Sequence, residues 1–106
     1  MFARTVRMEL KPNSAAEFTR LLEKEILPTL QKQQGFRDEI AFVPTDGKEA
    51  IAISLWAEKE HADSYHRSAY PEVAKTLAKV IVGVPRVETL EVCNSTLHKI
   101  TVRQAV

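Results

Sequence analysis

Apolar and polar residues alternate over residues 2–10, and this period of two predicts a β-strand. One face of the segment carries Phe2, Val6, Met8 and Leu10, and the other carries Thr5, Arg7 and Glu9. Arg4 breaks the pattern because it stands on the apolar face. Pro12 is expected to end the strand, since proline cannot donate a hydrogen bond to a neighbouring strand.

Between Ser14 and Gly35 the apolar residues recur every three or four positions, which predicts an amphipathic helix. The apolar stripe consists of Phe18, Leu21, Leu22, Ile26, Leu27 and Leu30. Ser14 and Glu17 have the spacing of a capping box, and Gly35 stands where a residue with positive φ commonly ends a helix. Pro28 lies inside the pattern and is expected to kink the helix, because it removes one backbone hydrogen bond.

Two further alternating segments, residues 36–43 and 50–56, are joined by the turn-forming sequence Pro-Thr-Asp-Gly at 44–47. This arrangement predicts an antiparallel hairpin. In the first segment the shared face carries Phe36, Ile40 and Phe42. In the second, Trp56 is expected on the face of small residues, opposite the stripe formed by Ile51, Ile53 and Leu55.

In the second half of the chain, the spacing of apolar residues predicts a helical region over residues 58–82, followed by a strand. Tyr70 precedes a proline and is expected to mark a bend, after which Pro71 restarts the helix. Gly83 is expected to end it. Residues 85–93 predict a fourth strand with a bulge near Glu88 and Thr89, where the alternation slips. Residues 97–102 form either a short fifth strand or an arm.

The order β-α-β-β-α-β predicts an α+β, ferredoxin-like fold with a four-stranded antiparallel sheet. We expect one domain over residues 1–96, with residues 97–106 as a C-terminal strand or arm contacting the partner subunit. The sheet face not covered by helices is expected to carry Ala3, Ala41, Val43, Ala52, Trp56 and Val87 or Cys93, mixed with Thr5, Arg7 and Glu39. Such an apolar face is unfavourable in a monomer, so the pattern predicts a homodimer in which two sheets close against each other.

Composition narrows the class of function. The 106 residues hold 15 Lys and Arg against 14 Asp and Glu, a net charge of +1 that argues against nucleic-acid binding. No apolar run approaches the roughly 18 residues of a membrane span, and charges near the start interrupt any secretion signal. A single cysteine, Cys93, fits a reducing compartment, so a cytoplasmic location is expected. Three glycines, none in a Gly-rich loop, argue against a phosphate-binding loop.

The segment SLWAEKEHADSYHRSAYPEVAKTL resembles the antibiotic biosynthesis monooxygenase (ABM) domain, a branch of the dimeric α+β barrels. That family ends its third strand in Trp, begins the next helix with acidic residues and places a His near its middle. Trp56 and His66 match this pattern, and the resemblance covers most of residues 1–96. It implies a homodimer with a separate cavity in each subunit, between the sheet and the helices.

The resemblance also implies an activity. Some relatives are cofactor-independent monooxygenases of phenolic or quinol-type compounds, in which the deprotonated substrate itself gives an electron to oxygen. The expected function is therefore oxygenation of a small aromatic or quinol-type substrate, with neither cofactor nor metal. The alternative is a non-catalytic homodimeric module that binds a small ligand or a partner protein. A haem-degrading branch uses Trp, His and an Asn on the first strand, but that strand here reads ARTVRMEL, without Asn.

His66 is the candidate catalytic residue, because an imidazole titrates near neutrality and can accept a phenolic proton. The alternative is an inert histidine, hydrogen-bonded at a boundary of the fold. His61 lies about 140° away around an ideal helix, so the two do not form a metal site, and His61 is expected in solvent.

Four other residues are candidates for substrate binding. Trp56 either walls the pocket or plugs the end of the sheet. The hydroxyls of Tyr65 and Tyr70 either anchor a substrate oxygen or are wetted tips of packed rings. Arg4 either faces the cavity to bind an enolate or carboxylate, or lies at the edge of the core with its charge in water.

Overall fold

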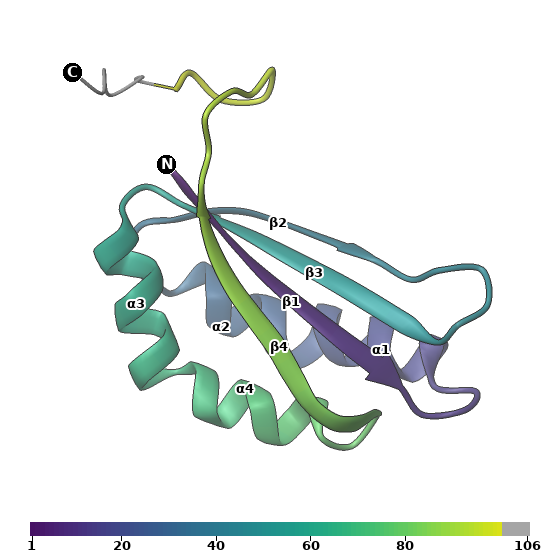
Figure 1. Cartoon of the computed structure of the whole chain (residues 1–106). Coiled ribbons are helices and arrows are strands. Elements are labelled where there is room, and N and C mark those ends of the chain that lie inside the picture. Colours follow the sequence, from purple (N-terminus) through teal and green to yellow (C-terminus); the bar gives the residue numbers. More distant parts are fainter. Residues whose placement is uncertain (101–106) are drawn as a thin grey trace.

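The computed structural model describes residues 1–100 and consists of one antiparallel sheet covered on one side by helices (Figure 1). In chain order the elements are β1 (Phe2–Leu10), α1 (Ala15–Leu21), the π-helical turn η1 (Leu22–Ile26), α2 (Leu27–Gln31), β2 (Phe36–Phe42), β3 (Glu49–Trp56), α3 (Lys59–Ser68), α4 (Tyr70–Leu77) and β4 (Ile81–Glu91). The strands lie in the order β2-β3-β1-β4. The prediction of a ferredoxin-like α+β fold is confirmed.

The hydrophobic core lies between the sheet and the helices. Strand β1 contributes Val6, Met8 and Leu10, as its alternation predicts. The apolar stripe of the first helical region lies against them through Phe18 and Leu21, which are almost fully buried. Burial of this stripe stabilises the helices, which are too short to be stable alone in water.

The first helical region departs from prediction at both of its special residues. Ser14 Oγ donates to the carbonyl of Pro12 rather than capping α1, so the predicted capping box does not form. The irregularity expected from Pro28 lies one turn earlier, where the N–H of Leu27 donates to the carbonyl of Leu22. This five-residue spacing makes a π-helical turn. The helix then continues through Pro28, which occupies the first turn of α2, where no backbone donor is needed.

The second helical region breaks at the expected place but ends early. Helix α4 begins at Tyr70, with Pro71 in its first turn, which confirms the predicted bend. It ends at Leu77 rather than residue 82, because residues 78–80 turn the chain into β4, which begins at Ile81. Gly83, expected to end the helix, lies inside β4 with a φ of +72°. The register between β1 and β4 shifts opposite residues 83–85, so the bulge lies there and not near residues 88–89. The strand ends at Glu91.

The last described segment turns away from the sheet (Figure 1). Residues 97–100 form no strand, and residues 101–102 of the predicted fifth strand lie outside the described residues. His98 contacts the carboxylate of Asp38 on β2, so this segment returns to one end of the sheet.

The predicted alternation of β3 is confirmed, with Trp56 on the face of small residues, but the side of the sheet assigned to that face is wrong. Ala52 pairs with Val6 across the sheet, so both point toward the helices, and Trp56 on the same face is completely buried. The register of β2 shifts between Phe36 and Asp38. After that shift Glu39 and Ala41 face the helical side with Val43, and Val87 faces it from β4 opposite Val6. Residues paired directly across two strands lie on the same face of the sheet, so the register alone assigns each of these residues to a face.

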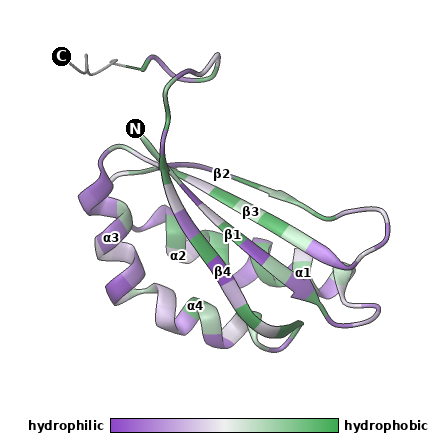
Figure 2. Ribbon diagram, viewed as in Figure 1, coloured by the Kyte–Doolittle hydropathy of each residue, from purple (hydrophilic) through white to green (hydrophobic). Residues whose placement is uncertain are grey.

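The uncovered face is therefore more apolar than predicted. Ala3, Thr5 and Arg7 lie on it, as expected. Its large apolar residues are Ile40, Phe42, Ile51, Ile53, Leu55 and Leu90. Ile40 is 54% exposed and Phe42 is 48% exposed. Figure 2 shows apolar residues along β3 in the middle of the sheet. Near one end, Glu49 forms ion pairs with both Arg7 and Arg86.

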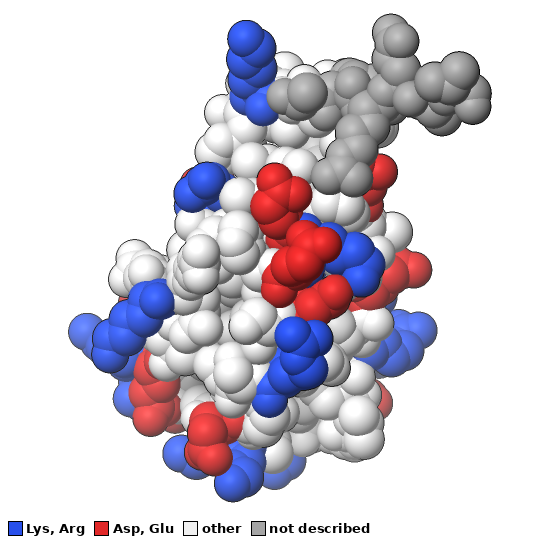
Figure 3. Space-filling view, turned by 90° about the vertical axis from the view of Figure 1, so that its left-hand side faces the viewer, with Lys and Arg blue, Asp and Glu red and all other residues white. Residues whose placement is uncertain are grey.

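Most of the ion pairs on the helices join exposed side chains on their outer surfaces. On the side of the molecule shown in Figure 3, basic and acidic side chains are interspersed. Lys59 pairs with Asp63 on α3 at 2.8 Å, and Lys75 pairs with Glu72 on α4 at 3.1 Å. Within residues 1–100, no helix combines the length and the apolar character needed to cross a membrane.

Gly35 provides a test of the packing between the end of the first helical region and α3. Its φ is +81°, and a Cβ there would overlap the ring of His61. Gly47 also has a positive φ, +68°, but open space around it. We expect Gly47→Ala to lower the free energy of unfolding by about 1 kcal/mol from backbone strain. Gly35→Ala should cost roughly 1–3 kcal/mol more, from overpacking. Urea unfolding measures both, and equal losses would contradict this packing.

Candidate functional site

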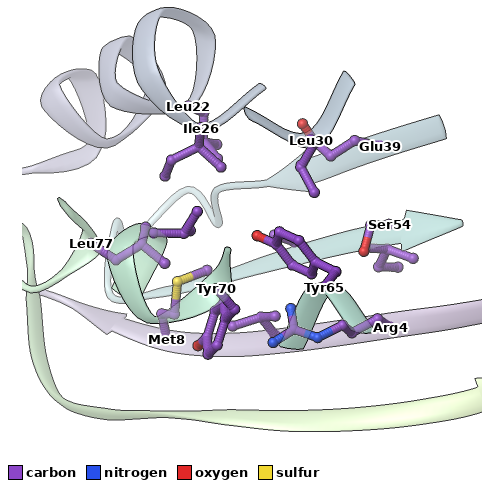
Figure 4. Close-up of a pocket in the computed structure, with 14 residues that line it drawn as sticks. Arg4, Met8, Leu22, Ile26, Leu30, Glu39, Ser54, Tyr65, Tyr70 and Leu77 are labelled. Atoms are coloured by element: carbon purple, nitrogen blue, oxygen red, sulfur yellow. The ribbon is translucent and has the colours of Figure 1, made fainter. Parts of the chain in front are cut away.

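A small cavity lies between the sheet and the helical layer (Figure 4). Its volume is about 30 Å³, and most of its lining is apolar. The apolar residues come from β1, η1, α2, β3 and α4 and include Val6, Met8, Leu22, Ile26, Leu30 and Leu77. Polar groups enter this lining from Arg4, Glu39, Ser54, Tyr65 and Tyr70. The cavity is therefore apolar, with a few polar side chains in its lining.

Arg4 is the only charged residue in the buried core of the described chain, and it is 3% exposed. The alternation of β1 places it on the helix-facing side, one step along from Val6. Burial lowers the pKa of its guanidinium, while nearby Tyr65 and Tyr70 oppose that shift. No carboxylate within residues 1–100 forms a salt bridge with Arg4, and its buried Nε has no hydrogen-bond partner there.

Aromatic rings hold the Arg4 charge in place of a carboxylate. Its guanidinium carbon lies 4.1 Å from the centre of the Tyr70 ring and 5.1 Å from that of Tyr65. The negative faces of aromatic rings attract a cation at such distances. Arg4 Nη2 also lies 3.0 Å from Nδ1 of His66, whose ring stacks on Tyr70 with centres 5.3 Å apart.

The contact with Arg4 defines the state of the His66 ring. A guanidinium can only donate hydrogen bonds, so Nδ1 of His66 accepts one and carries no proton. The neutral ring then has its proton on Nε2. His66 is exposed and does not line the cavity. Its predicted catalytic role stays a prediction, but the lone pair of Nδ1 is already engaged by Arg4.

Trp56 and Tyr65 extend the aromatic cluster to the end of the sheet. Their rings stack with centres 5.1 Å apart, and Trp56 Nε1 donates to Ser54 Oγ at 2.8 Å. Burial raises the pKa of Tyr65 to about 12, so its phenol is neutral at physiological pH. The fold thus brings the five predicted site residues into one contiguous cluster, although only Arg4, Tyr65 and Tyr70 line the cavity.

His61 is not the solvated residue that its position predicts. Its Nδ1 is buried without a hydrogen-bond partner, and its ring packs against Gly35. The close approach of the two segments forces this burial. Among the described residues, no three His, Cys, Asp or Glu side chains come together as a metal site.

Sequence reasoning missed Glu39 and Ser54 as cavity residues. The strand register places Glu39 opposite Ser54 and Ser54 opposite Arg4, so the three form one row on the helix-facing side. Burial raises the pKa of the Glu39 carboxyl. Glu39 reaches the cavity because the register of β2 shifts between Phe36 and Asp38; without that shift its side chain would point to the uncovered face. Nothing in the alternation of the sequence itself marks the shift.

Solved structures share this fold over most of their length. NE2512, a protein of unknown function from Nitrosomonas europaea, has a TM-score of 0.73 at 18% identity, covering 92% of this chain and 94% of that chain. A monooxygenase from the gene ActVA-Orf6 of Streptomyces coelicolor, in complex with nanaomycin D, has a TM-score of 0.75 at 14% identity, covering 92% of each chain. SnoaB, a cofactor-independent oxygenase from Streptomyces nogalater, has a TM-score of 0.74 at 12% identity, covering 92% of this chain and 97% of that chain.

At these identities the similarity establishes the fold alone. No curated protein matches the sequence. A family match is nevertheless clear, because residues 1–77 fit the family described as antibiotic biosynthesis monooxygenase, and this stretch is well over half of the 106 residues. The stretch contains β1, the hairpin and both helical regions, and with them every candidate site residue. The chain belongs to the antibiotic biosynthesis monooxygenase family.

Proposed function

We propose that this protein is a cofactor-independent monooxygenase of a small aromatic or quinol-type substrate that binds as an anion beside Arg4. The observation that carries the proposal is the buried Arg4 guanidinium, which faces an apolar cavity with an unpartnered Nε–H. A buried cation without an anion is unfavourable, so the site favours a ligand that brings a negative charge. Two structural neighbours are a monooxygenase and a cofactor-independent oxygenase by description, which supports the same chemistry.

The proposed reaction begins with loss of a proton from the substrate. A nearby cation lowers the pKa of an acidic phenol or enol, so Arg4 favours the phenolate or enolate. This electron-rich anion gives one electron to molecular oxygen, which leaves a substrate radical and superoxide. Their recombination forms a carbon–oxygen bond to a peroxide. The peroxide takes up a proton, its O–O bond breaks and water leaves, so that one oxygen atom stays on the substrate as a carbonyl. The protein supplies an apolar space, a fixed positive charge and neutral phenols that donate hydrogen bonds.

The remaining site residues support Arg4 in this proposal. Tyr70 and Tyr65 lie against its guanidinium, and the neutral phenol of Tyr65 is available as a hydrogen-bond donor. Trp56 orients Tyr65 by stacking on it. His66 accepts a hydrogen bond from the Arg4 guanidinium and lies outside the cavity lining, so we assign it a positioning role through Arg4.

The size of the cavity supports a second candidate function. A volume of about 30 Å³ accommodates about one water molecule, whereas binding sites for small molecules commonly measure several hundred cubic ångströms. A substrate therefore needs the surrounding side chains to move. The alternative is a non-catalytic module that binds a smaller ligand, in which case binding occurs without oxygen consumption.

We also propose that the protein acts as a homodimer. The uncovered sheet face exposes Ile40 and Phe42 at its edge, and three further apolar residues of β3 lie beside them. A second copy of this face would cover them in a two-fold arrangement. The contact between His98 and Asp38 brings the start of the proposed C-terminal arm to the same face, next to where the partner would lie.

The dimer is tested by sedimentation of Ile40→Glu. A charge within the proposed apolar interface occurs once on each subunit, and burying both charges should weaken dimerisation about 100-fold. Val84→Glu is the matched control, since Val84 is 88% exposed and lies in the bulge of β4. A wild-type protein that sediments as a monomer at micromolar concentration would refute the dimer.

Oxygen uptake with 1,8-dihydroxyanthrone and a panel of hydroquinones tests the activity. Arg4→Met should lower kcat/KM by about 100-fold or more, because it removes the charge that stabilises the anion. Its thermal stability should be equal or higher, since the unpaired buried charge is gone. Arg20→Met is the control, because Arg20 is exposed and pairs with Glu17. Wild-type uptake no faster than in buffer would contradict the proposed function and favour the binding module.

A further inference from the structure

Glu39 lies at the boundary between two hollows of the molecule. It lines the buried cavity, and it also lines a groove of about 190 Å³ between β2 and the first helical region. Leu22, in the π-helical turn, is the other residue that lines both. Figure 4 shows Glu39 beside Leu30, across the cavity from Arg4. A ligand in the cavity would therefore contact Glu39 at one end and Arg4 at the other.

The sheet sets the spacing between these two groups. Glu39, Ser54 and Arg4 occupy neighbouring strands in one cross-strand row. Adjacent strands lie about 4.8 Å apart, so the backbones of Glu39 and Arg4 are separated by about 10 Å. The two side chains form no salt bridge in the described chain. The row therefore places Glu39 and Arg4 on the wall of the cavity with Ser54 between them, and a substrate that contacts both needs the surrounding side chains to move.

The surroundings of Glu39 suit a proton acceptor. Its side chain is half-buried, and burial alone accounts for the rise in its pKa, with neither a cation nor a hydrogen-bond donor acting against it. A carboxylate whose pKa is raised binds a proton more strongly, so it is a stronger base than an ordinary carboxylate. The other titratable or charged groups that share its two hollows are Arg4, Tyr65, Tyr70 and Glu23.

We propose that Glu39 is the base that deprotonates the substrate. An acidic C–H or O–H bond of the substrate breaks, the proton moves to a carboxylate oxygen of Glu39, and the electron pair stays on the substrate as an enolate or phenolate held by Arg4. The inference rests on the proposed function for the identity of the substrate, but it concerns proton transfer alone. It also explains how the site obtains a base when His66 lies outside the cavity and its Nδ1 accepts a hydrogen bond from Arg4.

Deuterium exchange without oxygen isolates this step from oxygenation. The probe is 1,8-dihydroxyanthrone in D₂O under nitrogen, with exchange of the hydrogens on its ring CH₂ group followed by NMR. We expect the wild-type protein to accelerate exchange and Glu39→Gln to slow it by about 100-fold. Glu39→Asp should retain part of the rate. Glu23→Gln is the matched control, because Glu23 lines the groove but not the cavity, and it should exchange at the wild-type rate.

Thermal unfolding shows whether Glu39→Gln keeps the fold. Because folding raises the pKa of Glu39, the ionised carboxylate destabilises the folded state, and the wild type loses stability as pH rises from about 4.5 through the folded pKa. The Gln variant should therefore melt higher than the wild type at pH 7, and the two should converge toward pH 4.

The outcomes separate this inference from the proposed function. Exchange that depends on Glu39 without any oxygen uptake would support the base and refute the oxygenase. Wild-type rates of exchange in a folded Glu39→Gln variant, or no acceleration by the wild type, would overturn the role of Glu39 even if oxygen is consumed.

Discussion

The candidate site depends on one buried cation whose charge is met by rings instead of a carboxylate. Arg4 lies against Tyr65 and Tyr70 and donates to His66, which leaves its Nε–H free at the cavity wall. A carboxylate partner would neutralise the charge and leave nothing for a ligand. Aromatic faces stabilise the cation more weakly, so it remains available to an anion that enters the cavity. The same burial raises the pKa of Tyr65 to about 12, further above physiological pH.

The first helical region forms part of the cavity wall. The π-helical turn η1 supplies Leu22 and Ile26 to the lining, and it lies immediately before Pro28. Widened turns of this kind occur frequently at functional sites, because they displace side chains from the regular helical positions. Here the turn adjoins the boundary between the cavity and the outer groove. The small residues of β3, such as Ala50 and Ala52, leave the space into which these helices pack.

The sheet separates the candidate site from the apolar face that we propose as a dimer interface. The side covered by helices holds Trp56, Ser54 and Glu39, while the uncovered side carries Ile40 and Phe42. The two faces are separated by a single backbone layer. The proposed anion-binding site and the proposed dimer interface can therefore occupy opposite faces of the same strands without sharing side chains.

The sequence alone determined the strand and helix order, the break before Pro71, the apolar character of one open sheet face and the family. The element order, the break and the open face follow from local periodicity and from turn residues, which depend on near neighbours in the chain. The family followed from the resemblance of the segment around Trp56 and His66 to known members. Only the tertiary structure decided which side of β3 the helices cover, and with it the burial of Trp56. The face that Glu39 occupies depends on the register shift in β2, since a shift at one residue inverts every side chain after it. It also decided that Arg4 meets His66, 62 positions away, because contact between β1 and α3 depends on packing across the whole core.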